Sequence, residues 1–163
     1  MLKTSDAKPL KMPRRLYFPP LLQFLVYGLV GYLLAVNLPG LGFEFAAVLW
    51  ASVPIALAGL IVLLVAVRSF ARVGTTVNPI EPDKAGKLVT SGLYRFTRNP
   101  MYLGMLLVLI GGASALQNIA ALAGPALYMI SMTRFQIIPE ERVLERSFGS
   151  AFTAYCQQTR RWL

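Results

Sequence analysis

The residue types best suited to chemistry in this 163-residue chain are gathered in one short segment, 88–104. It combines two arginines, two tyrosines, an asparagine and a proline that would begin a helix: Tyr94, Arg95, Arg98, Asn99, Pro100 and Tyr102. Arginine pairs carboxylates through two parallel hydrogen bonds, and the start of a helix offers free backbone N–H groups to an anion. Taken alone, the segment favours a second interpretation, in which these arginines and tyrosines anchor the chain at a membrane surface.

Several kinds of chemistry are excluded by what the sequence lacks. It has no histidine and one cysteine, Cys156, which excludes histidine-ligated metal centres, histidine bases and an internal disulfide framework. We therefore expect no metal site. Glycine-rich nucleotide motifs of the Rossmann and P-loop types are also absent from the sequence.

Long uncharged runs predict membrane-spanning helices. Residues 16–43 form a run of 28 without charge, and 45–67 form a run of 23. A hydrocarbon core of about 30 Å is crossed by roughly 20 helical residues. The first run, trimmed by its prolines, predicts a helix over about 21–38. The second predicts a helix over 45–67 with a kink at Pro54.

A third uncharged run, 99–133, has 35 residues and is too long for one crossing. It predicts a hairpin of two helices, about 101–116 and 119–134, with a turn at Gln117-Asn118. Hydrophobic residues make up 56% of the chain and charged residues 14%. We expect an all-α integral membrane protein with four transmembrane helices, a helical hairpin at about 101–134 and a C-terminal amphipathic helix.

The sixteen Lys and Arg residues predict the orientation. They fall in three regions, 1–15, 68–98 and 134–161, which four crossings place on one side of the membrane. By the positive-inside rule, both termini and the 68–98 loop are cytoplasmic, in the plasma or inner membrane if the source is bacterial. The net charge of +9 then indicates topology and attraction to anionic lipid, with no nucleic-acid partner.

The segment 139–163 predicts an amphipathic helix on the membrane surface or on the bundle. Pro139 suits the first helical position, which places Glu140 and Glu141 in the first turn. A bend is expected at Gly149. The ending Arg160-Arg161-Trp162 is typical of an interfacial anchor.

The order of these residues resembles the isoprenylcysteine carboxyl methyltransferase family, and it is also similar to phospholipid N-methyltransferases. The resemblance covers about residues 68–163. It rests on Gly92-x-Tyr94-x-x-x-Arg98-Asn99-Pro100-x-Tyr102-x-Gly104, on Glu140-Glu141 after an apolar hairpin, and on the ending at Arg161-Trp162. Many eukaryotic members have histidine where this chain has Asn99, and an amide does not act as a base near neutral pH.

The resemblance implies a single membrane-embedded methyltransferase domain over 1–163 that uses S-adenosylmethionine and a hydrophobic, lipid or lipidated acceptor. It implies catalytic roles for Arg98, Glu140 and Glu141, with 139–163 as a lid over the cofactor. The implied cofactor-binding residues are Leu88, Val89, Thr90, Gly92, Tyr94, Arg98, Asn99, Pro100, Tyr102 and Glu140. From the resulting hairpin we expect Tyr102 and Glu140 to lie close together.

The chemistry of methyl transfer favours a carboxylate acceptor, because a carboxylate needs no general base. Two alternatives remain open at this point. One is an NADPH-dependent membrane reductase similar to sterol reductases, which share an arginine-proline-tyrosine segment but are usually much longer. The other is a non-enzymatic membrane scaffold.

Overall fold

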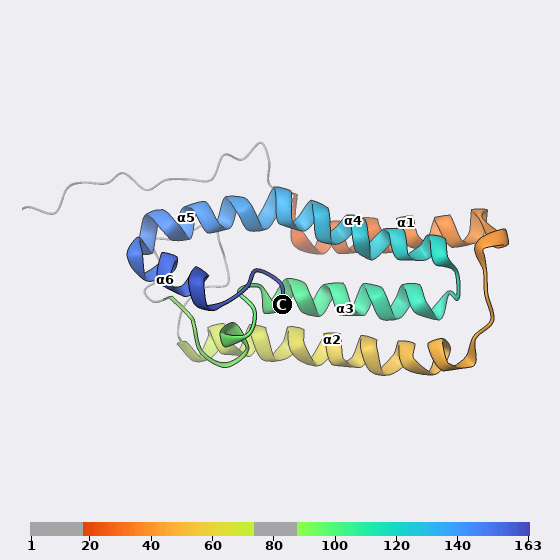
Figure 1. Ribbon diagram of the computed structural model, residues 1–163, viewed down its shortest axis with the longest axis horizontal. Helices are drawn as coiled ribbons and strands as arrows, with labels where there is room; N and C mark the ends of the chain where they lie inside the picture. Colours follow the sequence, from red (N-terminus) through yellow and green to blue (C-terminus); the bar gives the residue numbers. More distant parts are fainter. Residues whose placement is uncertain (1–17, 74–87) are drawn as a thin grey trace, which may run out of the picture.

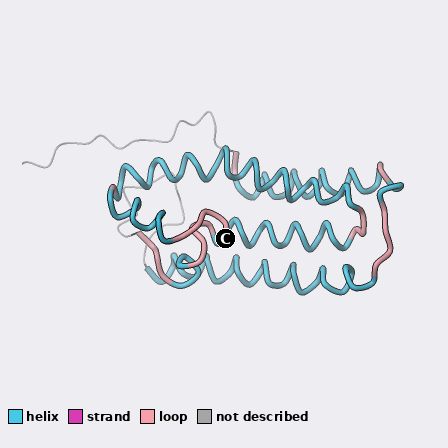
Figure 2. The backbone as a smooth tube through the Cα atoms, viewed as in Figure 1, coloured by secondary structure: helices cyan, strands magenta, loops and turns pink. Residues whose placement is uncertain are grey.

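A computed structural model describes residues 18–73 and 88–163, and within them every regular element is a helix (Figures 1 and 2). The predicted basic tail, 1–15, and residues 74–87 of the predicted 68–98 loop lie outside the described residues. In chain order the elements are α1 (Pro20–Asn37), η2 (Pro39–Leu41), α2 (Ala46–Val73), η4 (Gly92–Arg95), α3 (Pro100–Ala115), η5 (Ile119–Leu122), α4 (Ala123–Met132), the π-helical turn η6 (Thr133–Ile137), α5 (Ile138–Phe148) and α6 (Ser150–Gln158).

Proline residues lie at both ends of α1, whereas the one proline of α2 lies inside the helix. α1 begins at Pro20, where a missing N–H costs nothing, and it ends before Pro39. α2 continues through Pro54 to Val73. The loop was therefore predicted to begin too early, since after Gly59 no glycine or proline occurs in the sequence before Gly74.

α1 and the span Ala46–Ser69 of α2 are long and apolar enough to cross a membrane. Only 11% of each span is buried, and the exposed surface is mainly Leu, Val and Ile. A core helix of a soluble protein would be largely covered. α3 is also apolar but has 16 residues. The chain thus has the construction of a membrane protein.

α3 lies at the centre of the bundle, with α2 on one side and α1 and α4 on the other (Figure 1). Small residues bring the backbones close. A Cβ atom at Gly104 of α3 would lie 2.7 Å from the carbonyl oxygen of Gly59 in α2. One at Gly124 of α4 would lie 2.5 Å from the carbonyl oxygen of Tyr27 in α1. Such contacts are typical of helices packed in membranes.

Polar side chains join the helices at two levels. The hydroxyl of Ser131 in α4 donates to the buried amide oxygen of Gln23 in α1 over 2.8 Å. At the end far from α5, Asn118 Nδ2 donates to the carbonyl oxygen of Leu38 (2.9 Å), and Gln117 Nε2 donates to that of Phe45 (2.9 Å). The turn predicted at Gln117-Asn118 is confirmed, and it connects the ends of α1, α2 and α3.

α4, η6 and α5 form one continuous helical path, with right-handed helical dihedrals at each junction. Pro139 therefore does not begin an isolated helix, although Glu140 and Glu141 do lie in the first turn of α5. Proline has no N–H for the carbonyl four residues earlier, and its ring collides with that carbonyl in a regular helix. The wider turn of η6, directly before Pro139, accommodates the ring.

The C-terminal segment folds back on the bundle. Gly149 has a φ of 53°, ends α5 and so confirms the expected bend. α6 then returns toward the start of α3, as Figure 1 shows. Residues 159–163, which we call the C-terminal strap, pass beside residues 97–99, with Thr97 and Arg160 forming a parallel bridge.

Candidate active site

The candidate site lies where the start of α3, the η6–α5 junction and the C-terminal strap meet. Backbone contacts hold the strap there: the N–H of Arg98 donates to the carbonyl oxygen of Arg160 over 2.9 Å. The side-chain amide of Asn99 donates to the carbonyl oxygen of Arg161, also over 2.9 Å. Asn99 therefore supports the strap, a role that needs an amide donor and no base.

Glu140 accepts hydrogen bonds from two uncharged donors. Its Oε1 atom accepts a hydrogen bond of 2.8 Å from the hydroxyl of Tyr102. The same oxygen accepts a hydrogen bond from Nε2 of Gln136, one turn earlier. The predicted proximity of Tyr102 and Glu140 is thus confirmed.

Glu141 is the centre of a charged cluster. Its Oε1 lies 3.2 Å from Nη2 of Arg98, and its Oε2 lies 2.7 Å from Nη2 of Arg161. Arg161 also donates from Nε to Oε1 over 3.1 Å, and this pairing raises the pKa of its guanidinium. Two cations therefore share one carboxylate, which leaves one positive charge without an ionic partner inside this cluster.

Arg98 is only partly satisfied by these contacts. Its side chain is 14% exposed, Nη1 faces the sulfur of Cys156, and Nε is buried with no hydrogen-bond partner. A thiol is a weak acceptor, and an unsatisfied buried guanidinium N–H costs free energy. The surroundings of Arg98 therefore suit an added anionic acceptor such as a carboxylate.

Burial dominates the acid–base behaviour of Glu140. It raises the pKa of this carboxyl from 4.5 to about 7, and the neighbouring Glu141 raises it further, while hydrogen bonds from Gln136 and Tyr102 act in the opposite direction. Nearby, burial also raises the pKa of Tyr155 to about 12. The Tyr155 hydroxyl donates to the carbonyl oxygen of Tyr94 over 2.6 Å, which fixes η4 against α6.

The structure brings together some of the residues that the sequence predicted. Arg98 contacts Glu141, Tyr102 contacts Glu140, and Pro100 is buried at the first position of α3. The remaining predicted residues belong to the segment before α3: Leu88, Val89 and Thr90 in irregular backbone, Gly92 at φ 63° and Tyr94 in η4. Of these, Tyr94 is buried and close enough to Glu140 that the charge of this carboxyl adds to burial in raising the pKa of Tyr94.

Sequence reasoning missed Gln136 and misjudged the end of the chain. Gln136 precedes Glu140 by four residues, a helical spacing that offered a signal. Arg161 and Trp162 were interpreted as an interfacial anchor. Instead, Arg161 pairs with Glu141, and Nε1 of Trp162 donates to the hydroxyl of Thr133 over 3.1 Å. The carboxylate of Glu141 attracts Arg161 toward the bundle, and the sequence pattern did not reveal this pairing.

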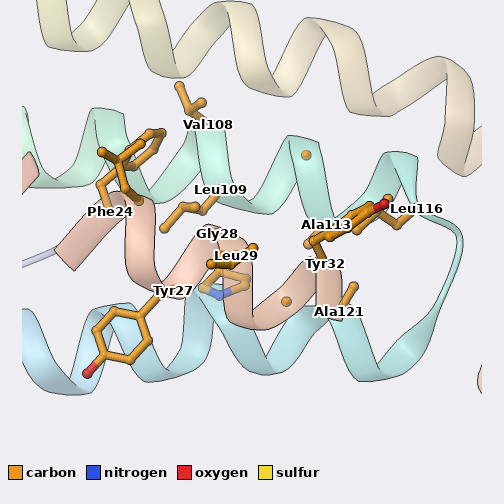
Figure 3. Close-up of a pocket in the computed structure, with 14 residues that line it drawn as sticks. Phe24, Tyr27, Gly28, Leu29, Tyr32, Val108, Leu109, Ala113, Leu116 and Ala121 are labelled. Atoms are coloured by element: carbon orange, nitrogen blue, oxygen red, sulfur yellow. The ribbon is translucent and has the colours of Figure 1, made fainter. Parts of the chain in front are cut away.

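A separate cavity of about 390 Å³ lies between α1 and α3 (Figure 3). Its walls are apolar, and they lie along the middle of α1 and the second half of α3, away from the clusters around Glu140 and Glu141. Six of its lining residues are Phe24, Gly28, Tyr32, Val108, Leu109 and Leu116. Its lining includes two tyrosines but no Asp, Glu, Lys, Arg or Cys, so the cavity offers less to the chemistry than the two clusters do.

The raised pKa of Glu140 predicts a pH-dependent stability. The native protein holds the proton of Glu140 to a higher pH than the unfolded chain does, so the free energy of unfolding falls as pH rises from about 4.5 to about 7. Glu140→Gln removes this contribution, on the order of 3 kcal/mol. Denaturant unfolding in detergent across this window measures it, with the exposed Glu145→Gln as control. An unchanged pH slope in Glu140→Gln contradicts the assignment.

Comparison with known proteins identifies the family. No solved structure matches the chain. An uncharacterised protein of Haemophilus influenzae is 40% identical over 63 residues, which are 39% of this chain and the whole of that relative. The model of the phospholipid methyltransferase family matches residues 47–151, which include α2, α3, α4 and all of α5 with both glutamates of the site. The chain therefore belongs to the phospholipid methyltransferase family.

Proposed function

We propose that this protein transfers a methyl group from S-adenosylmethionine to a lipophilic or membrane-borne acceptor. The observation that carries the proposal is the meeting of Arg98 and Tyr102 with Glu140 and Glu141 inside the region that matches the methyltransferase family. A binding site that holds both a cationic and an anionic side chain suits a cofactor that carries both charges.

The polar atoms of the site fit this cofactor. Arg98 Nε is a buried donor without an acceptor, and Gln136 Oε1 is a buried acceptor without a donor. Arg98 is suited to hold the carboxylate of the cofactor, and the two glutamates favour its positive charge. When bound, S-adenosylmethionine supplies a methyl group on a sulfonium, which is electrophilic without help from a metal.

The work left to this chain is positioning and exclusion of water. Charge is dispersed as a methyl group leaves a sulfonium, so a dry and aligned site favours the reaction. The C-terminal strap contributes to both, because it covers the start of α3 through Arg160 and Arg161. Trp162 and Tyr102 both pack against the buried cluster of α3 and α4.

We favour a carboxylate as the methyl acceptor. A carboxylate attacks without losing a proton, whereas an amine or thiol must first be deprotonated, and this sequence has no histidine to do so. An acceptor anchored in the bilayer would reach the site from the side of the bundle. Mild alkali separates the possibilities, because it hydrolyses a methyl ester and leaves an N-methyl or S-methyl product intact.

We further propose four crossings, with both termini and the site on the cytoplasmic side. α1 and α2 supply two spans, and α3 with the continuous path α4–η6 supplies the others. In Figure 1, α5, α6 and the start of α3 lie at one end of the bundle, while η2 and η5 lie at the other. Within 18–73 and 88–163, every Lys or Arg residue is an arginine in the last turns of α2, just before α3, or from η6 onward.

The topology predicts opposite labelling of two engineered cysteines. In a Cys156→Ala background, Lys8→Cys should react with a membrane-impermeant maleimide only from the cytoplasmic side. Gly40→Cys should react only from the other side, since Gly40 is exposed and a Cβ there meets nothing within 4 Å. Labelling of both cysteines from the same side of sealed vesicles contradicts four crossings.

The cofactor assignment predicts binding of S-adenosylhomocysteine, the demethylated product, at micromolar or better affinity, about −8 kcal/mol. Arg98→Ala should weaken binding by about 1.5–3 kcal/mol, because it removes a charge-assisted pair. Calorimetry in detergent measures this. Arg95→Ala makes the same change of charge at an exposed neighbour and should leave the affinity unchanged. Binding of NADPH in place of S-adenosylhomocysteine refutes the methyltransferase proposal and supports a reductase.

The lid role of 139–163 predicts that its last part is needed for cofactor binding. Deletion of 150–163 removes Arg161 and Trp162 together with α6, and should abolish binding of S-adenosylhomocysteine while α1–α4 stay inserted. Calorimetry tests binding, and alkaline extraction of membranes tests insertion. A truncated protein that still binds with the affinity of the full chain shows that the segment is no lid.

A further inference from the structure

Gln136 is a buried amide that uses only half of its hydrogen-bonding capacity. Its side chain is 1% exposed, and Nε2 donates to Glu140. Its Oε1 atom is buried and has no partner. While Glu140 is ionised, this orientation is fixed, since the reverse would place two acceptor oxygens against each other. An unpartnered buried acceptor is costly, and few survive in folded proteins without a ligand or water to satisfy them.

The backbone that carries Gln136 is itself unusual. Gln136 lies in η6, the π-helical turn over Thr133–Ile137. Turns of this kind are rare and occur frequently at functional sites. Here the turn admits Pro139 and leaves Gln136 one turn before Glu140, so that one hydrogen bond joins the two side chains. The backbone of this turn thus holds the side chain of Gln136 against Glu140 in the site.

The polarity of the unpartnered oxygen defines what it can bind. The neighbour of this oxygen is the carboxylate of Glu140. A cationic N–H donor is therefore stabilised by a hydrogen bond to Gln136 and by the charge of Glu140, whereas a neutral donor is stabilised by the hydrogen bond alone. The opposite requirement lies on the Glu141 side, where Arg98 has a buried donor without an acceptor. Arg98 and Tyr102 are four residues apart and contact Glu141 and Glu140 respectively, so both requirements lie at the start of α3. An α-amino acid group satisfies both.

We propose that Gln136 is a cofactor-binding residue, whose carbonyl oxygen accepts a hydrogen bond from the ammonium group of the amino-acid end of S-adenosylmethionine. Glu140 assists through its charge, and Arg98 receives the carboxylate of the same end. This inference rests on the proposed function and assigns a role that the proposed function alone does not require.

Three ligands with the same adenosine group test the assignment. S-adenosylhomocysteine has both the ammonium and the carboxylate, its decarboxylated analogue keeps only the ammonium, and 5′-methylthioadenosine has neither. Gln136→Met removes the amide at similar length. It should weaken the first two ligands by about 10- to 100-fold, the usual loss for a hydrogen bond to a charged group. It should change the dissociation constant of 5′-methylthioadenosine by no more than about two-fold.

Gln136→Glu keeps an acceptor oxygen and should preserve the preference for the two ammonium ligands. Gln23→Met is the matched control, because Gln23 is equally buried but has partners at both ends of its amide, Phe18 and Ser131. Gln23→Met should leave the ratios between the dissociation constants of the three ligands unchanged. If Gln136→Met weakens all three ligands equally, or none, the inference is wrong. If the unaltered protein binds none of the three, the proposed function fails, and the inference fails with it.

Discussion

The carboxylate of Glu141 is the contact on which the arrangement of the site depends. It pairs with Arg98, just before α3, and with Arg161, in the C-terminal strap. These three residues come from parts of the chain that are brought together only by folding. Because two guanidinium groups compete for one carboxylate, the pairing organises the site and still leaves Arg98 with unused donor capacity. Structural cohesion and readiness for an anionic ligand thus come from the same ion pair.

Glu140, the preceding residue, is bound by uncharged partners and not by cations. It is held by neutral donors, Tyr102 and Gln136, and burial brings its pKa to about 7. Adjacent carboxyl groups therefore have different surroundings: Glu141 lies between two guanidinium groups, and Glu140, with a pKa of about 7, is close to the balance between its two protonation states. The first turn of α5 therefore contacts the start of α3 in two ways. Glu141 forms an ion pair with Arg98, and Glu140 accepts a hydrogen bond from Tyr102.

Much of the helical frame follows from the sequence, because uncharged runs and prolines have local consequences. The limits of α1, the start of α3 at Pro100 and the bend at Gly149 are of this kind. The meeting of Tyr102 and Glu140 followed from the hairpin. The inward path of Arg161 and Trp162 did not, because it depends on partners in α5 and η6 that no pattern near the C-terminus indicates. Gln136 was missed because its significance lies in one unsatisfied atom, which composition does not reveal.

The amides of Gln117 and Asn118 have a mechanical consequence. They tie the ends of three helices together at the end of the bundle opposite to the site. α3 extends from that junction for 16 residues, about 24 Å, to the residues that hold Arg98 and Tyr102. Over that lever arm, a tilt of about 5° at the turn displaces the start of the helix by about 2 Å, more than the tolerance of a hydrogen bond. The position of the charged groups therefore depends in part on the opposite end of the bundle, through two uncharged side chains that lie far from the site.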